Sequence, residues 1–162
     1  MSIGYQGPPE WAEFFRDRGS AALAALDLPD AEVSLVVCDD AAIRPLNREW
    51  RGKDAATDVL SFPQLELEGP MTGPLERRPD GPPLVLGDIV ISLETASRQA
   101  AAYGHTEKQE LIVLLVHGLL HLLGYTHGDA VSRARMGEME ARCLSGIEPG
   151  YAGLVARAGP PE

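Results

Sequence analysis

The chain has few cysteines, few aromatic residues and no long apolar run. Its two cysteines, Cys38 and Cys143, stand far apart, which argues against a disulfide framework. No apolar run reaches the roughly 18 residues that a membrane-spanning helix needs, and the N-terminus lacks the basic and apolar segments of a signal peptide. We therefore expect a cytoplasmic protein with no membrane partner, in which both cysteines are small core residues rather than metal ligands.

Positive charge is also scarce. The formal net charge of −10 argues against broad, nonspecific affinity for nucleic acid, because contacts to phosphates supply most of such binding. It leaves room for a local basic groove, so the positions of the few cations matter more than their sum. The 162 residues and the hydrophobic content of 44% suit a single globular domain that covers residues 1–162.

The spacing of apolar residues and of capping residues predicts helices and strands in alternation. Helices are expected over 10–28, 40–50, 93–103, from a capping box at 106–109 through residue 121, and over 129–144. Strands are expected over 32–39, 57–62 and 84–92, with 3–5 as a possible fourth. The segment 84–92 is almost wholly apolar and is expected at the centre of the sheet. The predicted fold class is α+β, with a small, mostly four-stranded sheet packed against about five helices.

Glycine and proline mark the expected breaks. Gly19 weakens the first helix, Pro45 is expected close to the start of the second, and Gly146 is expected to close the last. The proline- and glycine-rich segment 64–83 is expected to be a long surface loop within the domain rather than a second domain.

Three of the four histidines, His117, His121 and His127, fall within eleven residues. Residues four apart share one face of a helix, so His117 and His121 can offer their imidazoles to a single ion. Gly124 stands where the helix could end in a left-handed turn, which would bring His127 back as a third ligand. Three histidines leave one tetrahedral position open, as in catalytic zinc sites. The alternative, ordinary histidines at the end of a buried helix, is less favoured because unpaired imidazoles are costly to bury.

One residue of the familiar zinc peptidase pattern is missing. Such peptidases carry a glutamate directly after the first histidine, where it serves as general base for the water on zinc. Here that position is Gly118. Peptide hydrolysis is therefore the less favoured chemistry, although a zinc-dependent hydrolase of a small amide or peptide stays open as an alternative.

A second group of residues concentrates positive charge. Arg44, Arg48 and Arg51 are spaced to form one stripe along a helix, and Lys53 extends it. Arginine grips phosphate through a planar fork of donors, so the stripe is a candidate phosphate-binding surface. A solvated face with local pairs to carboxylates such as Asp54 is an equally good interpretation of the spacing alone.

Four segments taken in order resemble the YbeY family, bacterial endoribonucleases that act in ribosomal RNA maturation. They are NREWRGKD at 47–54, TDVLSFP at 57–63, LGDIVIS at 86–92 and HGLLHLLGYTH at 117–127, and the resemblance covers roughly residues 33 to 145. It implies a zinc ion held by His117, His121 and His127, a catalytic role for Arg51 near the scissile phosphate, and a zincin-like helix without the peptidase glutamate.

The resemblance also implies what the protein acts on. The expected function is zinc-dependent, single-strand-specific cleavage in the maturation of the 3′ end of small-subunit ribosomal RNA and in ribosome quality control, with ribosomal RNA and small-subunit components as partners. The chain departs from the family at two places, neither of which is a ligand position: the family usually has aspartate where this chain has Thr126, and the segment 64–83 is long and proline-rich for the family. A non-catalytic ribosome-assembly factor with structural zinc stays open as a second alternative.

Overall fold

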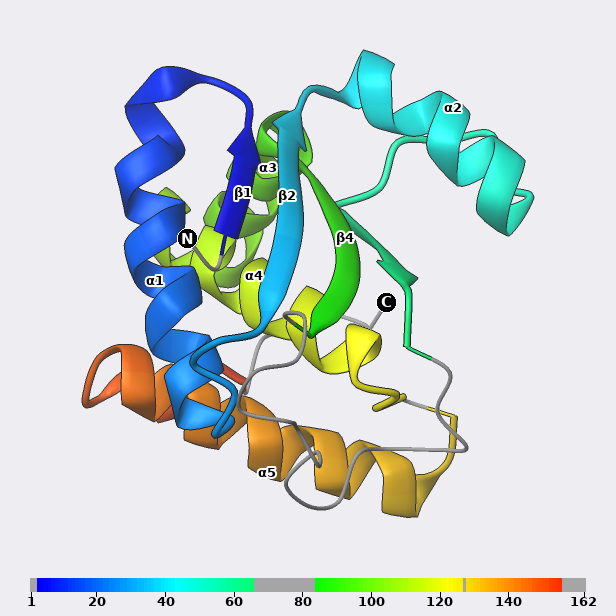
Figure 1. Ribbon diagram of the computed structural model, residues 1–162. Helices are drawn as coiled ribbons and strands as arrows, with labels where there is room; N and C mark the ends of the chain where they lie inside the picture. The colour runs from blue at the N-terminus through cyan, green and yellow to red at the C-terminus, as the bar shows by residue number, and fades with distance from the viewer. Residues whose placement is uncertain (1–2, 66–83, 127, 156–162) are drawn as a thin grey trace.

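The computed structural model describes residues 3–65, 84–126 and 128–155, and a four-stranded mixed sheet runs through it (Figure 1). The strands lie side by side in the order β1 (Ile3–Gln6), β2 (Glu32–Cys38), β4 (Val85–Ser92) and β3 (Val59–Pro63). β1, β2 and β4 are parallel, and β3 is antiparallel to β4. The fourth strand at the N-terminus and the central place of the 84–92 strand are confirmed.

Five α-helices lie within the described part of the chain. They are α1 (Ala12–Ala25), α2 (Asp40–Arg51), α3 (Leu93–Tyr103), α4 (Glu107–Leu122) and α5 (Ala130–Ile147), and short 3₁₀ turns cover Pro9–Trp11 and Tyr151–Val155. The predicted α+β class is thus confirmed. Four helices are capped by side chains: those of Asp39, Ser92, Thr106 and Asp129 accept hydrogen bonds from backbone N–H groups of the first turn.

The structure corrects three expectations about helix breaks. Gly19 does not interrupt α1; instead it lets α1 approach β1, since an added Cβ would lie 2.7 Å from Cδ1 of Ile3. Pro45 lies inside α2, which begins at the Asp39 cap, and the proline is tolerated on the exposed side of the helix. α5 continues through Gly146 to Ile147, and an added Cβ there would lie 2.8 Å from Cβ of Ala25 on α1. Close packing, and not chain reversal, explains both glycines.

The main core lies on one face of the sheet. α4 runs through it, and all six residues from 111 to 116 are at most 2% exposed. Alternate residues of the central strands face this core, among them Leu35, Ile89 and Ile91. α1 and α5 pack around α4 and are joined to it in the same cluster. Within residues 3–65, 84–126 and 128–155, no helix combines the length and hydrophobicity that a bilayer-spanning segment requires.

The opposite face of the sheet carries a much smaller cluster. Ile43 of α2 packs there on Leu60 of β3 and Val90 of β4, and Val36, Cys38, Leu46 and Phe62 adjoin them. Figure 1 shows α2 at the upper right, away from α1 and α5. A single short helix covers only part of this face, and a cleft forms beside it.

Cys143 is a core residue, as expected, whereas Cys38 is only partly buried. Cys143 is fully buried in the main core, and Cys38 packs against the small cluster. Burial, reinforced by Asp39 and Asp40, raises the pKa of the Cys38 thiol to about 11. Burial raises the pKa of Cys143 to about 12. Both thiols are therefore protonated at neutral pH, a state that neither binds zinc well nor attacks substrates.

Candidate active site

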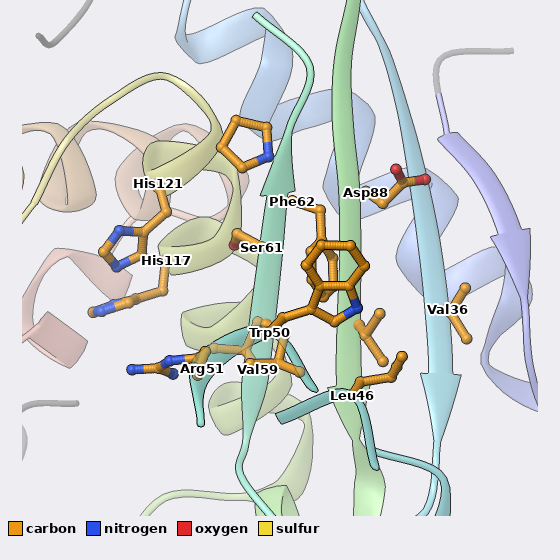
Figure 2. A pocket seen from close by; sticks show the side chains of 13 residues that line it. Val36, Leu46, Trp50, Arg51, Val59, Ser61, Phe62, Asp88, His117 and His121 are labelled. Carbon is orange, nitrogen blue, oxygen red and sulfur yellow. The ribbon is translucent and has the colours of Figure 1, made fainter. Parts of the chain in front are cut away.

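A cleft of about 910 Å³ joins the open face of the sheet to the C-terminal half of α4 (Figure 2). It is lined on one side by Trp50 and Arg51, the last two residues of α2, and on the other by His117 and His121 of α4. β3 forms the ridge between them. The cleft thus brings together predicted site residues that are 66 positions apart in the sequence.

The two helical histidines lie side by side at the mouth of this cleft. Their ring centroids are 5.2 Å apart with an interplanar angle of 53°, and the His117 side chain is 13% exposed. Figure 2 shows both rings projecting from the same side of α4. The helical spacing that predicted a shared direction for His117 and His121 is therefore confirmed in geometry.

The reversal after α4 also has the predicted form. Gly124 has a positive φ of 90°, Gly124 N–H donates to the carbonyl of His121, and Tyr125 N–H donates to the carbonyl of Leu120. This pair of hydrogen bonds is a Schellman motif, which ends a helix and turns the chain back. The third predicted ligand, His127, lies outside the described residues, as do residues 66–83 of the predicted surface loop.

The donors on α4 fit a zinc ion. Two imidazoles on one tetrahedral ion have ring centroids roughly 5 Å apart, given metal–nitrogen distances of about 2 Å, and the observed separation is 5.2 Å. Within the described residues no group of three or more His, Cys, Asp or Glu side chains gathers into a metal-binding arrangement. His117 and His121 are therefore the two predicted ligands that lie within the described residues, and the third, His127, lies outside them.

A carboxylate stands behind the first histidine. Oε2 of Glu140 on α5 lies 3.7 Å from Nδ1 of His117, and Glu140 is only 7% exposed. Metal-binding histidines commonly have their second ring nitrogen held by a carboxylate. Glu140 was not among the residues predicted from the sequence. The available signal was its place on the buried face of α5, in helical register with Met136, Cys143 and Leu144.

Gly118, the position of the peptidase glutamate, has no room for a side chain. An added Cβ would lie 2.9 Å from Cγ2 and 3.1 Å from Cδ1 of Ile89, which is fully buried on β4. The carbonyl of Gly118 accepts a hydrogen bond of 3.1 Å from Oγ of Ser61 on β3. Position 118 therefore faces the sheet, so a glutamate there would meet the core instead of the cleft.

The C-terminal end of α2 is fixed by backbone and amide contacts. Asn47, 2% exposed, donates from Nδ2 to the carbonyl of Ala55 at 2.9 Å. Gly52 adopts a left-handed conformation with φ of 71°, and its N–H donates to the carbonyl of Arg48. These contacts fold the chain back toward β3 and leave Arg51 exposed at the cleft.

Two arginines of the predicted stripe differ in their surroundings: one is paired locally with a carboxylate, and the other is available to bind phosphate. Arg44 forms a two-pronged pair with Asp54, with distances of 2.9 and 3.2 Å, and these hydrogen bonds hold the pKa of Asp54 below its ordinary value. Arg44 is thus a locally paired surface residue. Arg51 lines the cleft and faces the side where the histidines lie.

The carboxylate of Asp40 helps to tie the N-terminal end of α2 to α3. Asp40 accepts hydrogen bonds from the hydroxyls of Ser92 and Thr95 at 2.7 and 2.6 Å and from Arg98 at 2.8 Å. Burial acts to raise the pKa of Asp40, but these hydrogen bonds outweigh it and lower the pKa below its ordinary value. With so little core beneath α2, this network orients the helix that carries Arg51.

Comparison with known proteins agrees with the motifs of the site. The family model described as "Endoribonuclease YbeY" matches residues 8–148. A protein of that name from Anaeromyxobacter sp. is 49% identical over 150 residues, covering 93% of this chain and 71% of the relative. Another, from Moorella thermoacetica, is 52% identical over 128 residues, covering 79% and 80%. The solution structure of TM1509 from Thermotoga maritima has a similar fold, with a TM-score of 0.62 and 23% identity over 90% of this chain and 88% of that one.

Proposed function

The chain belongs to the family of Endoribonuclease YbeY, and on that premise we propose that it is a metal-dependent endoribonuclease that hydrolyses phosphodiester bonds of RNA. The finer proposal is a zinc enzyme specific for single-stranded RNA. It acts in the cytoplasm in the maturation of the 3′ end of small-subunit ribosomal RNA and in ribosome quality control, with ribosomal RNA and small-subunit components as partners.

The observation that carries this proposal is the shared cleft. Arg51 of α2 and the imidazoles of His117 and His121 line the same cavity, although they come from opposite sides of β3. RNA phosphates are anionic and favour a cationic fork beside a divalent metal. A cleft that offers both can hold a phosphodiester between them.

We assign His117, His121 and His127 as the zinc ligands and Arg51 as the catalytic residue. A bound zinc ion would supply Lewis acidity toward the phosphoryl group and activate a water nucleophile. Glu140 would fix the His117 ring from behind, so that its other nitrogen faces the cleft. Arg51 would bind the scissile phosphate and neutralise the charge that develops on it during cleavage.

The missing glutamate fits phosphoryl transfer better than peptide hydrolysis. Phosphoryl transfer depends mainly on positioning and on electrostatic stabilisation, and needs less from a general base in the protein. Peptide hydrolysis on this frame needs the glutamate, and position 118 packs against Ile89 with no space for one. The packing therefore favours the ribonuclease over the peptidase alternative.

The test compares two arginines of the same helix. Arg51→Ala should lower the rate of cleavage of ribosomal precursor RNA on the order of a hundredfold or more, as for loss of one electrostatic donor to a transition state. Arg51→Lys should restore only part of the rate, because a point charge lacks the bidentate fork. The control is Arg44→Ala, since Arg44 pairs with Asp54 and does not line the cleft.

Zinc content and melting temperature should be unchanged in all three arginine variants. Wild-type cleavage by Arg51→Ala, in a preparation free of contaminating nucleases, would remove this residue from the mechanism and favour an assembly factor without catalytic activity. Turnover of peptide libraries without cleavage of RNA would favour the hydrolase alternative.

A further inference from the structure

Beyond β3 the cleft continues onto the open face of the sheet, where its lining becomes aromatic and apolar. The register of the strands builds this floor. Leu60 of β3 pairs with Val90 of β4, which pairs with Val36 of β2, and in the next row Phe62 pairs with Asp88. All five residues line the cleft. The histidines and this floor therefore belong to one continuous surface.

Trp50 stands over this floor. The residue is 64% exposed, and its ring meets that of Phe62 edge to face, with centroids 5.9 Å apart and an angle of 73° (Figure 2). A single exposed aromatic residue is ordinary on a protein surface. Trp50 is unusual in its position, because it directly precedes Arg51 and lines the same cleft as His117 and His121. The contact with Phe62 holds the indole in place while most of it stays accessible.

The charges of the cleft assign different chemistry to its two ends. Arg51 and the histidines lie at one end, where a phosphate is attracted. Asp88 is the one acidic side chain among the described lining residues, and its carboxylate stands beside Phe62 at the other end, where a phosphate is repelled. The second end suits a group that is flat, uncharged and apolar on its faces. A nucleobase has these properties, and aromatic side chains bind unpaired bases by stacking.

We propose that Trp50 and Phe62, with Val90 beneath them, form a base platform that stacks one unpaired nucleobase of the RNA next to the phosphate held at Arg51. The base platform rests on the proposed function and adds to that function a source of selectivity for single-stranded RNA. Bases of a duplex are already stacked on their neighbours and paired across the helix, so they cannot lie on the platform without being extruded. A single strand offers its bases freely.

Trp50 itself reports on the binding. The chain has two tryptophans, and the second, Trp11, packs with Phe14 and Phe15 at the N-terminal end of α1, away from the cleft. In a Trp11→Phe protein, rapid mixing with a short single-stranded RNA should quench the Trp50 fluorescence before cleavage proceeds. The same RNA annealed to its complement should quench it far less. Trp11→Phe should keep the wild-type affinity and cleavage rate, and so serves as the aromatic control.

Affinity measurements then separate stacking from mere proximity. Trp50→Ala should weaken binding of single-stranded RNA roughly tenfold or more, the effect of losing one base–aromatic stack, and Trp50→Phe should keep most of it. RNAs that lack one base at a time should show a loss of similar size at one position. At that position the two losses should not add, because each removes the same contact. In cleavage assays Trp50→Ala should raise KM more than it lowers kcat.

The outcomes separate this inference from the proposed function. Unchanged affinity of Trp50→Ala, additive losses at every base position, or no quenching by single-stranded RNA would overturn the base platform, even if the protein cleaves RNA in a manner that depends on Arg51. Quenching and non-additive losses in a protein that does not cleave RNA would support the platform and overturn the enzymatic proposal.

Discussion

Replacing Gly118 by alanine tests how tightly α4 packs on the sheet beside the histidines. The new Cβ would lie 2.9 Å from Cγ2 and 3.1 Å from Cδ1 of Ile89, whose side chain is fully buried on the central strand β4. Overpacking of this kind costs about 1–3 kcal/mol, and removal of a helical glycine returns about 1 kcal/mol. We expect a net loss of about 1 kcal/mol, which lowers the melting temperature of a chain this size by roughly 2–4 °C.

Two further variants decide whether the contact with Ile89 causes the loss. Gly137 also lies inside a helix, but an added Cβ there meets no atom within 4 Å, so Gly137→Ala should stabilise by up to about 1 kcal/mol. Ile89→Ala removes the three atoms that the Cβ would meet. In that background Gly118→Ala should change sign and become stabilising.

The assay is urea-induced unfolding monitored by circular dichroism, and zinc content is measured on the same samples. Because Gly118 directly follows His117, a forced shift of α4 should also weaken zinc binding. If Gly118→Ala stabilises as much as Gly137→Ala, position 118 has room for a side chain. Packing would then not exclude a glutamate at this position.

Three other changes test the parts of the site separately. Glu140→Gln should weaken zinc binding roughly ten- to a hundredfold in competition with a chromophoric chelator, because its carboxylate lies 3.7 Å from the ring of His117; unchanged affinity would exclude a positioning role. Asp40→Asn should cost about 1 kcal/mol at neutral pH. The folded-state pKa of Asp40 is lowered. The carboxylate therefore contributes fully to the free energy of unfolding above its unfolded pKa of about 3.9, and this contribution disappears as the pH falls through the folded-state pKa. A stability difference between wild type and Asp40→Asn that does not depend on pH would contradict this. Chelation should lower the melting temperature of the wild type and leave that of His121→Ala unchanged; equal shifts in both would count against zinc at this position.

The features that the sequence predicted well are those governed by neighbours along the chain. The caps at Asp39, Ser92, Thr106 and Asp129 and the turn at Gly124 each depend on hydrogen bonds that span a few residues. The spacing of His117 and His121 is local in the same sense. Such features need only the helical period and the chemistry of one side chain.

The features that the sequence did not predict depend on contacts between distant segments. Gly146 resembles a helix terminator until Ala25 of α1 is placed beside it. The sequence does not distinguish Glu140 from the other acidic residues, because only the packing of α5 on α4 places its carboxylate beside His117. The sequence allowed both a paired and a phosphate-binding role for the arginines of α2, and only the fold of the 52–58 segment shows that Arg44 pairs with Asp54 while Arg51 lines the cleft.

One short strand explains how the two predicted groups of residues come to share a cleft. In β3 successive side chains point to opposite faces, so Ser61 reaches the carbonyl of Gly118 on α4 while Phe62 meets Trp50 on α2. The strand is anchored at its start by Asp58, which is 1% exposed. Its side chain accepts from the N–H of Val59, and its carbonyl accepts from the N–H of Ser92 on β4.

A slip of one residue in this register would exchange the two faces. Phe62 would then turn toward α4, the helix of His117 and His121, and Ser61 would turn toward the proposed platform. The segment 57–63 therefore fixes the position of the histidines on α4 relative to Arg51 on α2. None of the residues of this segment is assigned a chemical step. A change that loosens the anchor at Asp58 should for this reason impair RNA cleavage more than it impairs zinc binding, since both proposed zinc ligands within the described residues belong to α4.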